Sequence, residues 1–112
     1  MDIDYDYLRR LRQDEQGSMA LTPLPDDFYD AVREYVKEIK NRVGMDPCLD
    51  NMREYENLIK TLNDIVRLRL NKVILRSLHH QENTDNLTRE EKELYINIEK
   101  VIKSYELSLI HI

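Results

Sequence analysis

Apolar residues recur every three or four positions along three long segments of this 112-residue chain, and that spacing limits what the chain can fold into. One stripe runs through residues 28–39, a second through 55–73 and a third through 94–109. Such spacing places the apolar side chains on one face of an α-helix. The chain has only 2 glycines and 3 prolines, and 41% of its residues are hydrophobic. The sequence therefore predicts an all-α fold, a bundle of about four main helices with one long helix.

The chain is short enough to form one helical domain, which we assign to residues 1–112. Residues 1–15 are expected to form a short N-terminal helix. Residues 16–25 form a connector, because its two prolines lack a backbone N–H and restrict the residues before them. Residues 26–109 are expected to form the helical core of the domain.

Proline and acidic residues mark the expected starts of the helices. Pro25 fits the first turn of the second helix, where its missing N–H is no loss, and two aspartates follow it. Asp46-Pro47 repeats this pattern before the third helix, which we expect over about residues 47–80. Thr88 and Glu91 have the spacing of a capping box, which predicts the start of the fourth helix.

The second half of the third helix is apolar nearly all round, which indicates burial on several sides or cover by another protein. We expect these residues in the core: Phe28, Val32, Leu62, Val66, Ile98 and Ile102. We expect these residues at a partner interface: Leu68, Ile74, Leu75, Leu78, Tyr105 and Leu109.

Three basic residues, Arg69, Lys72 and Arg76, share one face of the third helix and could together bind an anion. The alternative is that their stems cover apolar surface while their charged groups pair with carboxylates of a neighbouring helix. We favour the alternative, because the chain has a net charge of −5. The same net charge limits any contact with DNA to a local and weak one.

No motif for catalysis, metal binding or cofactor binding occurs in the sequence, so we expect no catalytic residues, no metal and no cofactor. His79 and His80 are adjacent and would diverge on a helix, and Cys48 is the single cysteine. No stretch is long and apolar enough to predict a membrane span. One enzyme alternative stays open: an all-helical mutase of the chorismate type could hold a dicarboxylate with Arg69, Lys72 and Arg76.

Four stretches carry a resemblance to a known family. LTPLPDDFYDAVREYVKEI contains a helix-entry motif of Leu24, Pro25, Phe28 and Tyr29. YLRRLRQDEQ precedes it, and RLRLNKVILRSL and NLTREEKELYINI follow. In this order, across residues 4–105, they resemble GINS subunits, the helical accessory proteins of the replicative helicase, and most closely the archaeal ones.

The resemblance implies a non-catalytic subunit that scaffolds the replicative helicase in DNA replication. It implies other GINS subunits as partners, in a homo- or hetero-oligomer, together with the MCM helicase ring and a RecJ-like protein. It implies a cytoplasmic, nucleoid-associated location in an archaeon and a nuclear one in a eukaryote. Family members also carry a small β domain, and no strand-rich segment of that size occurs in this sequence. A helical adaptor unrelated to replication is a further alternative.

Overall fold

The computed structural model describes residues 3–79 and 85–110, and within them the chain is helical and contains no strand. The elements are α1 (Tyr5–Gly17), α2 (Phe28–Met45), α3 (Leu49–Leu78) and α4 (Arg89–Ile110). The all-α prediction is therefore confirmed, and so is the long third helix, which has 30 residues.

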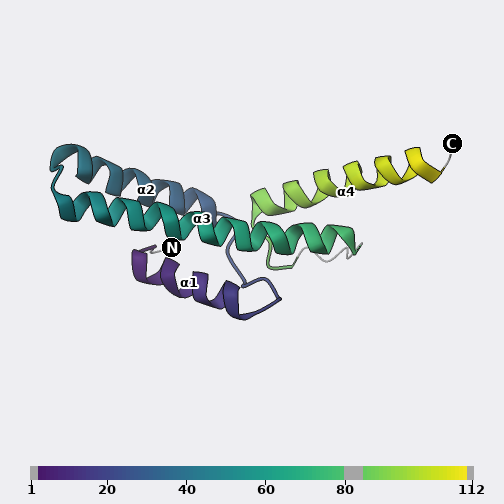
Figure 1. Cartoon of the computed structure of the whole chain (residues 1–112), viewed down its shortest axis with the longest axis horizontal. Coiled ribbons are helices and arrows are strands. Elements are labelled where there is room, and N and C mark those ends of the chain that lie inside the picture. Colours follow the sequence, from purple (N-terminus) through teal and green to yellow (C-terminus); the bar gives the residue numbers. More distant parts are fainter. Residues whose placement is uncertain (1–2, 80–84, 111–112) are drawn as a thin grey trace.

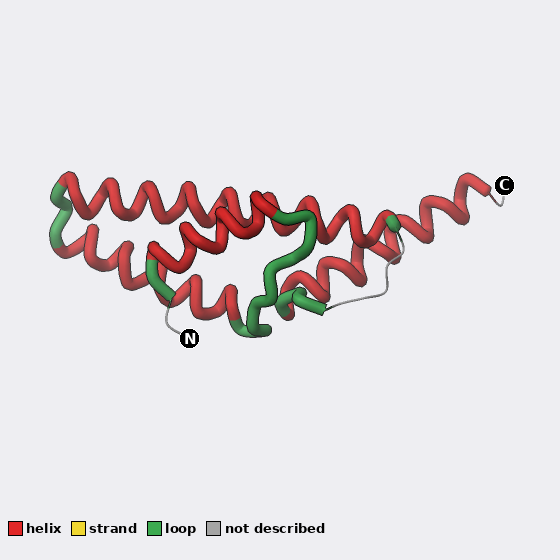
Figure 2. Tube along the Cα trace, turned by 90° about the horizontal axis from the view of Figure 1, so that it is seen from below, coloured by secondary structure: helices red, strands yellow, loops and turns green. Residues whose placement is uncertain are grey.

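The long helix α3 organises the molecule, because it contacts each of the other three helices. Helix α2 packs beside the N-terminal half of α3 and α1 beside its middle, whereas α4 starts beside the C-terminal half of α3 and diverges from it (Figure 1). The molecule is consequently elongated, with extents of 61 × 25 × 21 Å. The view from below in Figure 2 shows the connector running from the end of α1 to the start of α2 as an extended loop.

Two groups of buried apolar residues hold the helices together. The larger one, which we call the body core, joins α1, α2, α3 and the connector; it contains Leu8, Leu11, Leu24, Phe28, Val32, Ile39, Leu58 and Ile65. The smaller one, which we call the joint cluster, lies where α3 meets the start of α4; it contains Leu21, Val73, Leu87 and Tyr95. The body core therefore unites three helices, whereas α4 shares only the small joint cluster.

The helix starts differ in detail from those expected. Helix α2 begins at Phe28, and Pro25 lies before it in a turn closed by a hydrogen bond from the Phe28 N–H to the Pro25 carbonyl, 3.1 Å long. The expected acidic cap of α3 is also wrong. Cys48 precedes the first residue of α3, while the Asp46 N–H bonds to the Arg42 carbonyl and closes α2.

The expected core residues are buried to different degrees. Phe28 and Val32 lie in the body core as predicted, and Leu62 is partly buried against it. Val66 is 44% exposed, so its prediction as a core residue is wrong. The reason is that Val66 lines a pocket beside the first turns of α4, so the apolar stripe of α3 is not fully covered at that position. Ile98 and Ile102 of α4 are partly buried.

Candidate functional site

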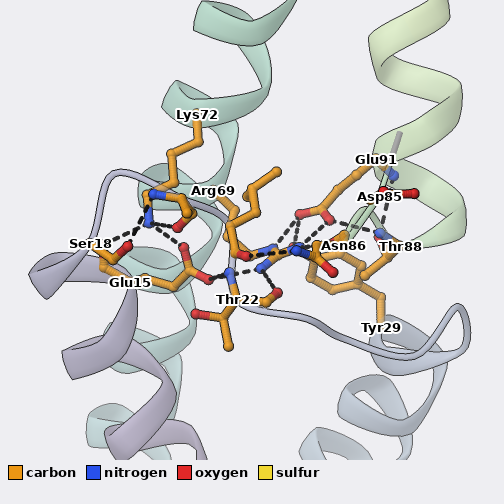
Figure 3. Close-up of polar contacts among 12 residues, drawn as sticks. Glu15, Ser18, Thr22, Tyr29, Arg69, Lys72, Asp85, Asn86, Thr88 and Glu91 are labelled. Atoms are coloured by element: carbon orange, nitrogen blue, oxygen red, sulfur yellow. Dashed lines mark hydrogen bonds and ion pairs between the residues drawn. The ribbon is translucent and has the colours of Figure 1, made fainter. Parts of the chain in front are cut away.

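The largest fully buried side chain in the described structure is Arg69, in the C-terminal half of α3. It is 0% exposed. Its Nε and Nη2 donate to the two carboxylate oxygens of Glu91, each at 2.7 Å, and its Nη1 donates to Glu15 Oε1 at 2.8 Å. Nη1 and Nη2 also donate to the carbonyls of Thr22 and Asn86, at 2.9 and 2.8 Å. All five N–H donors of the guanidinium are therefore used (Figure 3).

Lys72 lies one helical turn further along α3 and joins the same network. Its ammonium group donates to Glu15 Oε2 at 2.6 Å and to the carbonyls of Glu15 and Ala20. Arg76, another turn on, donates to the carbonyl of Asp85 at 3.0 Å. Arg69 and Lys72 therefore pair with carboxylates of neighbouring helices, as the favoured interpretation predicted. An open anion-binding face that includes Arg69 is wrong, because its charged group is enclosed.

Glu91 is the point where three helices meet in this network. Thr88 and Glu91 form the predicted capping box, with the Thr88 N–H donating to Glu91 Oε1 at 2.9 Å and the Glu91 N–H donating to Thr88 Oγ1 at 3.3 Å. The hydroxyl of Tyr29, in the first turn of α2, donates to Glu91 Oε2 at 3.1 Å. One carboxylate therefore caps α4 and ties it to both α3 and α2 (Figure 3).

The charges of this network are balanced, which lets them be buried together. Burial alone would raise the pKa of Glu91, but the hydrogen bonds from Arg69 and from the Thr88 N–H outweigh it and the pKa is lowered. Burial likewise opposes a lower pKa at Glu15, and the hydrogen bonds from Lys72 and Thr22 outweigh it. Both carboxyls are thus ionised near neutral pH, opposite Arg69 and Lys72.

Glu15 was missed by the sequence reasoning, although a signal for it exists. It follows Leu8 and Leu11 at i+7 and i+4, on the same face of α1, so a carboxylate occupies a position where the pattern calls for an apolar residue. A charged residue on the buried face of a helix needs a partner of opposite charge. That reasoning would have predicted an inward-facing base, which α3 supplies as Arg69 and Lys72.

The residues expected at a partner interface lie on the distal part of α3 and on α4. Leu68 and Ile74 are partly buried, whereas the others are exposed. Leu78, for example, has 51% of its surface accessible. The exposed set is Leu75, Leu78, Tyr105 and Leu109, and four further apolar residues of α4 that were not predicted are exposed with them: Ile96, Val101, Leu107 and Ile110.

A pocket of about 280 Å³ lies at the base of α4, between it and α3. Val66, Leu70 and Val73 line it from α3, and Leu94 from α4. Tyr29 of the helix-entry motif also lines it, while Leu24 and Phe28 of that motif lie in the body core. The motif therefore has two roles: it anchors the start of α2 and it contributes Tyr29 to the network around Glu91.

Among residues 3–79 and 85–110 no group of three or more His, Cys, Asp or Glu side chains is placed to hold a metal ion. Within the same ranges, no helix has the length and apolar character to cross a membrane. His79 is an exposed residue at the end of α3, and His80 lies outside the described residues.

Comparison with known proteins gives the family. Residues 5–112 match the family described as GINS complex subunit Psf2/Psf3-like N-terminal domain. The chain is also 30% identical over 98 residues to an uncharacterized protein of Methanocaldococcus jannaschii; the alignment covers 88% of this chain and 43% of that protein, so the chain spans less than half of its relative's length. No solved structure shows a significant match. Because the family match extends over nearly the whole chain, this protein belongs to the GINS complex subunit family, as a Psf2/Psf3-like N-terminal domain.

Proposed function

We propose that the chain is a non-catalytic subunit of a GINS complex that joins the MCM helicase ring to a RecJ-like protein during DNA replication. Family membership supports the role in a GINS complex. The observation that carries the scaffold role is the set of exposed apolar residues on α3 and α4. A small soluble protein rarely leaves so many large apolar residues open along neighbouring helices unless another protein covers them.

The proposed interface with other GINS subunits is the distal part of α3 together with the outer half of α4. It contains Leu68, Ile74, Leu75, Leu78, Tyr105 and Leu109. These residues lie on helices, so the expected contact is helix on helix, with apolar anchors at its centre and polar groups at its rim. Any contact with DNA is local and weak.

The structure offers a physical reason to prefer a scaffold to a mutase. A mutase that holds a dicarboxylate needs guanidinium donors directed at an open site. Every donor of Arg69 is already bonded within the chain, and the side chain has no exposed surface. A substrate carboxylate would have to displace Glu15 or Glu91 from a closed network.

Sedimentation velocity of the purified chain at micromolar concentration, alone and mixed with the other GINS subunits of its source, tests the interface. We expect an oligomer or a mixed complex, and we expect Leu78→Asp to abolish it by placing an unpaired charge in an apolar contact. Met45→Asp is the matched control, because Met45 is 89% exposed and is the last residue of α2, close in sequence to the N-terminal end of α3. A monodisperse monomer in every mixture, or equal loss in both variants, would contradict the proposed interface.

Affinity capture with the source organism's MCM helicase and RecJ-like protein tests the scaffold role separately. Each purified protein is mixed with the tagged GINS complex that contains this chain. We expect both to be retained together, and retention of neither would overturn the scaffold proposal while leaving membership of the complex intact. Turnover of chorismate that Arg69→Ala abolishes would instead support the mutase alternative.

A further inference from the structure

Helix α4 is attached to the rest of the molecule through few buried residues. Of its 22 residues, only Glu91 and Tyr95 are buried, and both lie in its first two turns. Beyond them α4 diverges from α3, as Figure 1 shows, and most of its outer half is exposed. A small error in direction at the start of α4 would therefore displace its far end by a large distance.

Apolar packing at the base of α4 is incomplete and cannot define its direction alone. The pocket of about 280 Å³ lies between α3 and α4 here, and the part of Val66 that α4 leaves uncovered is exposed. Apolar contact is also non-directional, since its free energy depends on the area removed from water. Contact between Leu94 and α3 therefore does not by itself select one direction for α4.

The polar contacts of Glu91, in contrast, are directional. Its carboxylate accepts two parallel hydrogen bonds from Arg69, one from the Tyr29 hydroxyl and one from the Thr88 N–H. A bidentate guanidinium–carboxylate pair fixes both distance and orientation. The donors come from α3, from α2 and from the residue that precedes α4, so the carboxylate is held from three directions.

The remaining ion pairs between α4 and the region around the start of α2 lie nearer the surface. Arg89 pairs with Asp30, Lys92 with Asp26 and Arg33 with Glu90; Glu90 is 29% exposed and the other five side chains are at least two-fifths exposed. Exposed ion pairs contribute little and tolerate changes of geometry. They cannot fix the direction of α4 as a buried pair can.

We propose that Glu91 is a positioning residue: its buried contacts with Arg69, Tyr29 and Thr88 set the angle at which α4 leaves α3. The angle decides how the apolar faces of α3 and α4 are placed relative to each other. The effect of this angle on assembly rests on the interface proposed above, but the angle itself is a property of the isolated chain. Preorganised faces bind with less loss of conformational entropy than faces that must first be ordered.

Double electron–electron resonance on the whole chain tests the proposal. Spin labels are attached at exposed positions of α3 and α4, through Lys60→Cys and Ser104→Cys, after Cys48→Ser has removed the native thiol. With Glu91 unchanged, the distances between the two spin labels should form one narrow distribution. Glu91→Gln should broaden it at least twofold, because an amide has one acceptor oxygen where the carboxylate has two.

Glu93→Gln is the matched control, since Glu93 carries the same charge on the same helix but is exposed. It should leave the distribution unchanged, and circular dichroism should show equal helix content in all variants. An unchanged distribution in Glu91→Gln, or equal broadening in Glu93→Gln, would overturn the proposal.

Tyr29→Phe keeps the test decisive if Glu91→Gln fails to fold. It removes one hydrogen bond to Glu91 and retains the ring, so we expect a smaller broadening, about half of that in Glu91→Gln. With Glu91→Gln unfolded, a distribution identical to that of the unchanged joint would overturn the proposal. The result is independent of the sedimentation experiment, because it is obtained on the chain alone: absence of assembly contradicts the interface, whereas an unchanged distance distribution contradicts the joint.

Discussion

The two ends of α3 are covered in different ways. Around its N-terminal part, α1, α2 and the connector surround it with the body core, in which Leu8, Phe28 and Ile65 have no exposed surface. Around its C-terminal part, α4 covers it only near the joint cluster, and Arg69 forms buried ion pairs there with Glu15 and Glu91. We call α1, α2 and the part of α3 that they contact the body, and apolar packing holds it together. We call α4 the arm, and the hydrogen-bonded side chains Glu15, Arg69 and Glu91, which hold it, the joint.

The two regions contribute differently: the body to the stability of the fold and the joint to the direction of α4. Burying apolar side chains stabilises the body by roughly 1.5–3 kcal/mol for each large residue. A buried ion pair gives little net stability, because desolvation of the two charges offsets their attraction. What the pair supplies instead is a single arrangement, since any other leaves a charge buried without a partner. The body accordingly provides the folding energy and the joint provides the direction of the arm.

Removing the base at the joint should give the largest effect on stability. Arg69→Met leaves Glu15 and Glu91 buried with much of their compensating charge lost, and the free energy of unfolding should fall by about 3–5 kcal/mol. Arg67→Met, at an exposed position two residues away, should change it by less than about 0.5 kcal/mol. Urea unfolding followed by circular dichroism measures both, and similar values for the two variants would refute a buried joint.

Creating a cavity in the body should cost nearly as much. Ile65→Ala removes three carbon atoms from a fully buried site between α1, α2 and α3, and should lower the free energy of unfolding by about 2–5 kcal/mol. The same urea series measures it. A loss below about 1 kcal/mol would mean that the body core is not the main source of stability.

Acid should weaken the joint before it affects the apolar packing of the body. The pKa values of Glu15 and Glu91 are lowered from their ordinary value of 4.5 in the folded chain. As the pH falls below about 4.5, the unfolded chain therefore binds protons first, and stability is lost until the pH has passed through the lowered pKa values. The slope should approach about 1.4 kcal/mol per pH unit for each additional proton bound on unfolding.

Urea unfolding at a series of pH values between neutrality and pH 3 measures this slope. Glu91→Gln should have a shallower slope than the unchanged chain, because one of the two carboxyls no longer titrates. Glu93→Gln should keep the full slope. Parallel slopes for the unchanged chain and Glu91→Gln would show that Glu91 takes no part in the pH dependence.

Loss of the helix cap should have a moderate effect confined to the arm. Thr88→Ala removes the hydroxyl that accepts from the Glu91 N–H and should cost about 0.5–2 kcal/mol. Amide hydrogen exchange should accelerate in the first turns of α4 and remain unchanged in α2. Equal acceleration in both helices would indicate that the arm and the body unfold as one unit.

The sequence predicts the body better than the joint, for a physical reason. Helical spacing identifies which face of a helix is buried, and so Phe28 and Val32 were assigned to the core correctly. The Thr88 and Glu91 capping box was also predictable, because its donors and acceptors are only three residues apart. Local patterns thus define the helices and their inner faces.

Contacts between distant segments are not contained in such patterns. Arg69 falls within the apolar stripe of α3, but its partners are 54 and 22 residues away, and periodicity does not say which helices become neighbours. Val66 was assigned to the core from the helical spacing of α3 alone, and it is 44% exposed. The spacing does not say which positions of the stripe a neighbouring helix covers.

The smallest effect is expected in the arm, where truncating a large apolar side chain to alanine should hardly change the free energy of unfolding. Val101 is 69% exposed on α4, so truncation to alanine removes little buried area, and alanine favours the helical state more than valine does. Val101→Ala should therefore change the free energy of unfolding by less than about 0.5 kcal/mol, against about 2–5 kcal/mol for Ile65→Ala. The measurement is made at two protein concentrations tenfold apart, because a residue of the arm that self-association covers would show a loss that grows with concentration. A loss above about 1.5 kcal/mol that is independent of concentration would mean that the arm is packed within the single chain as the body is, and the contrast between the two regions would then be wrong.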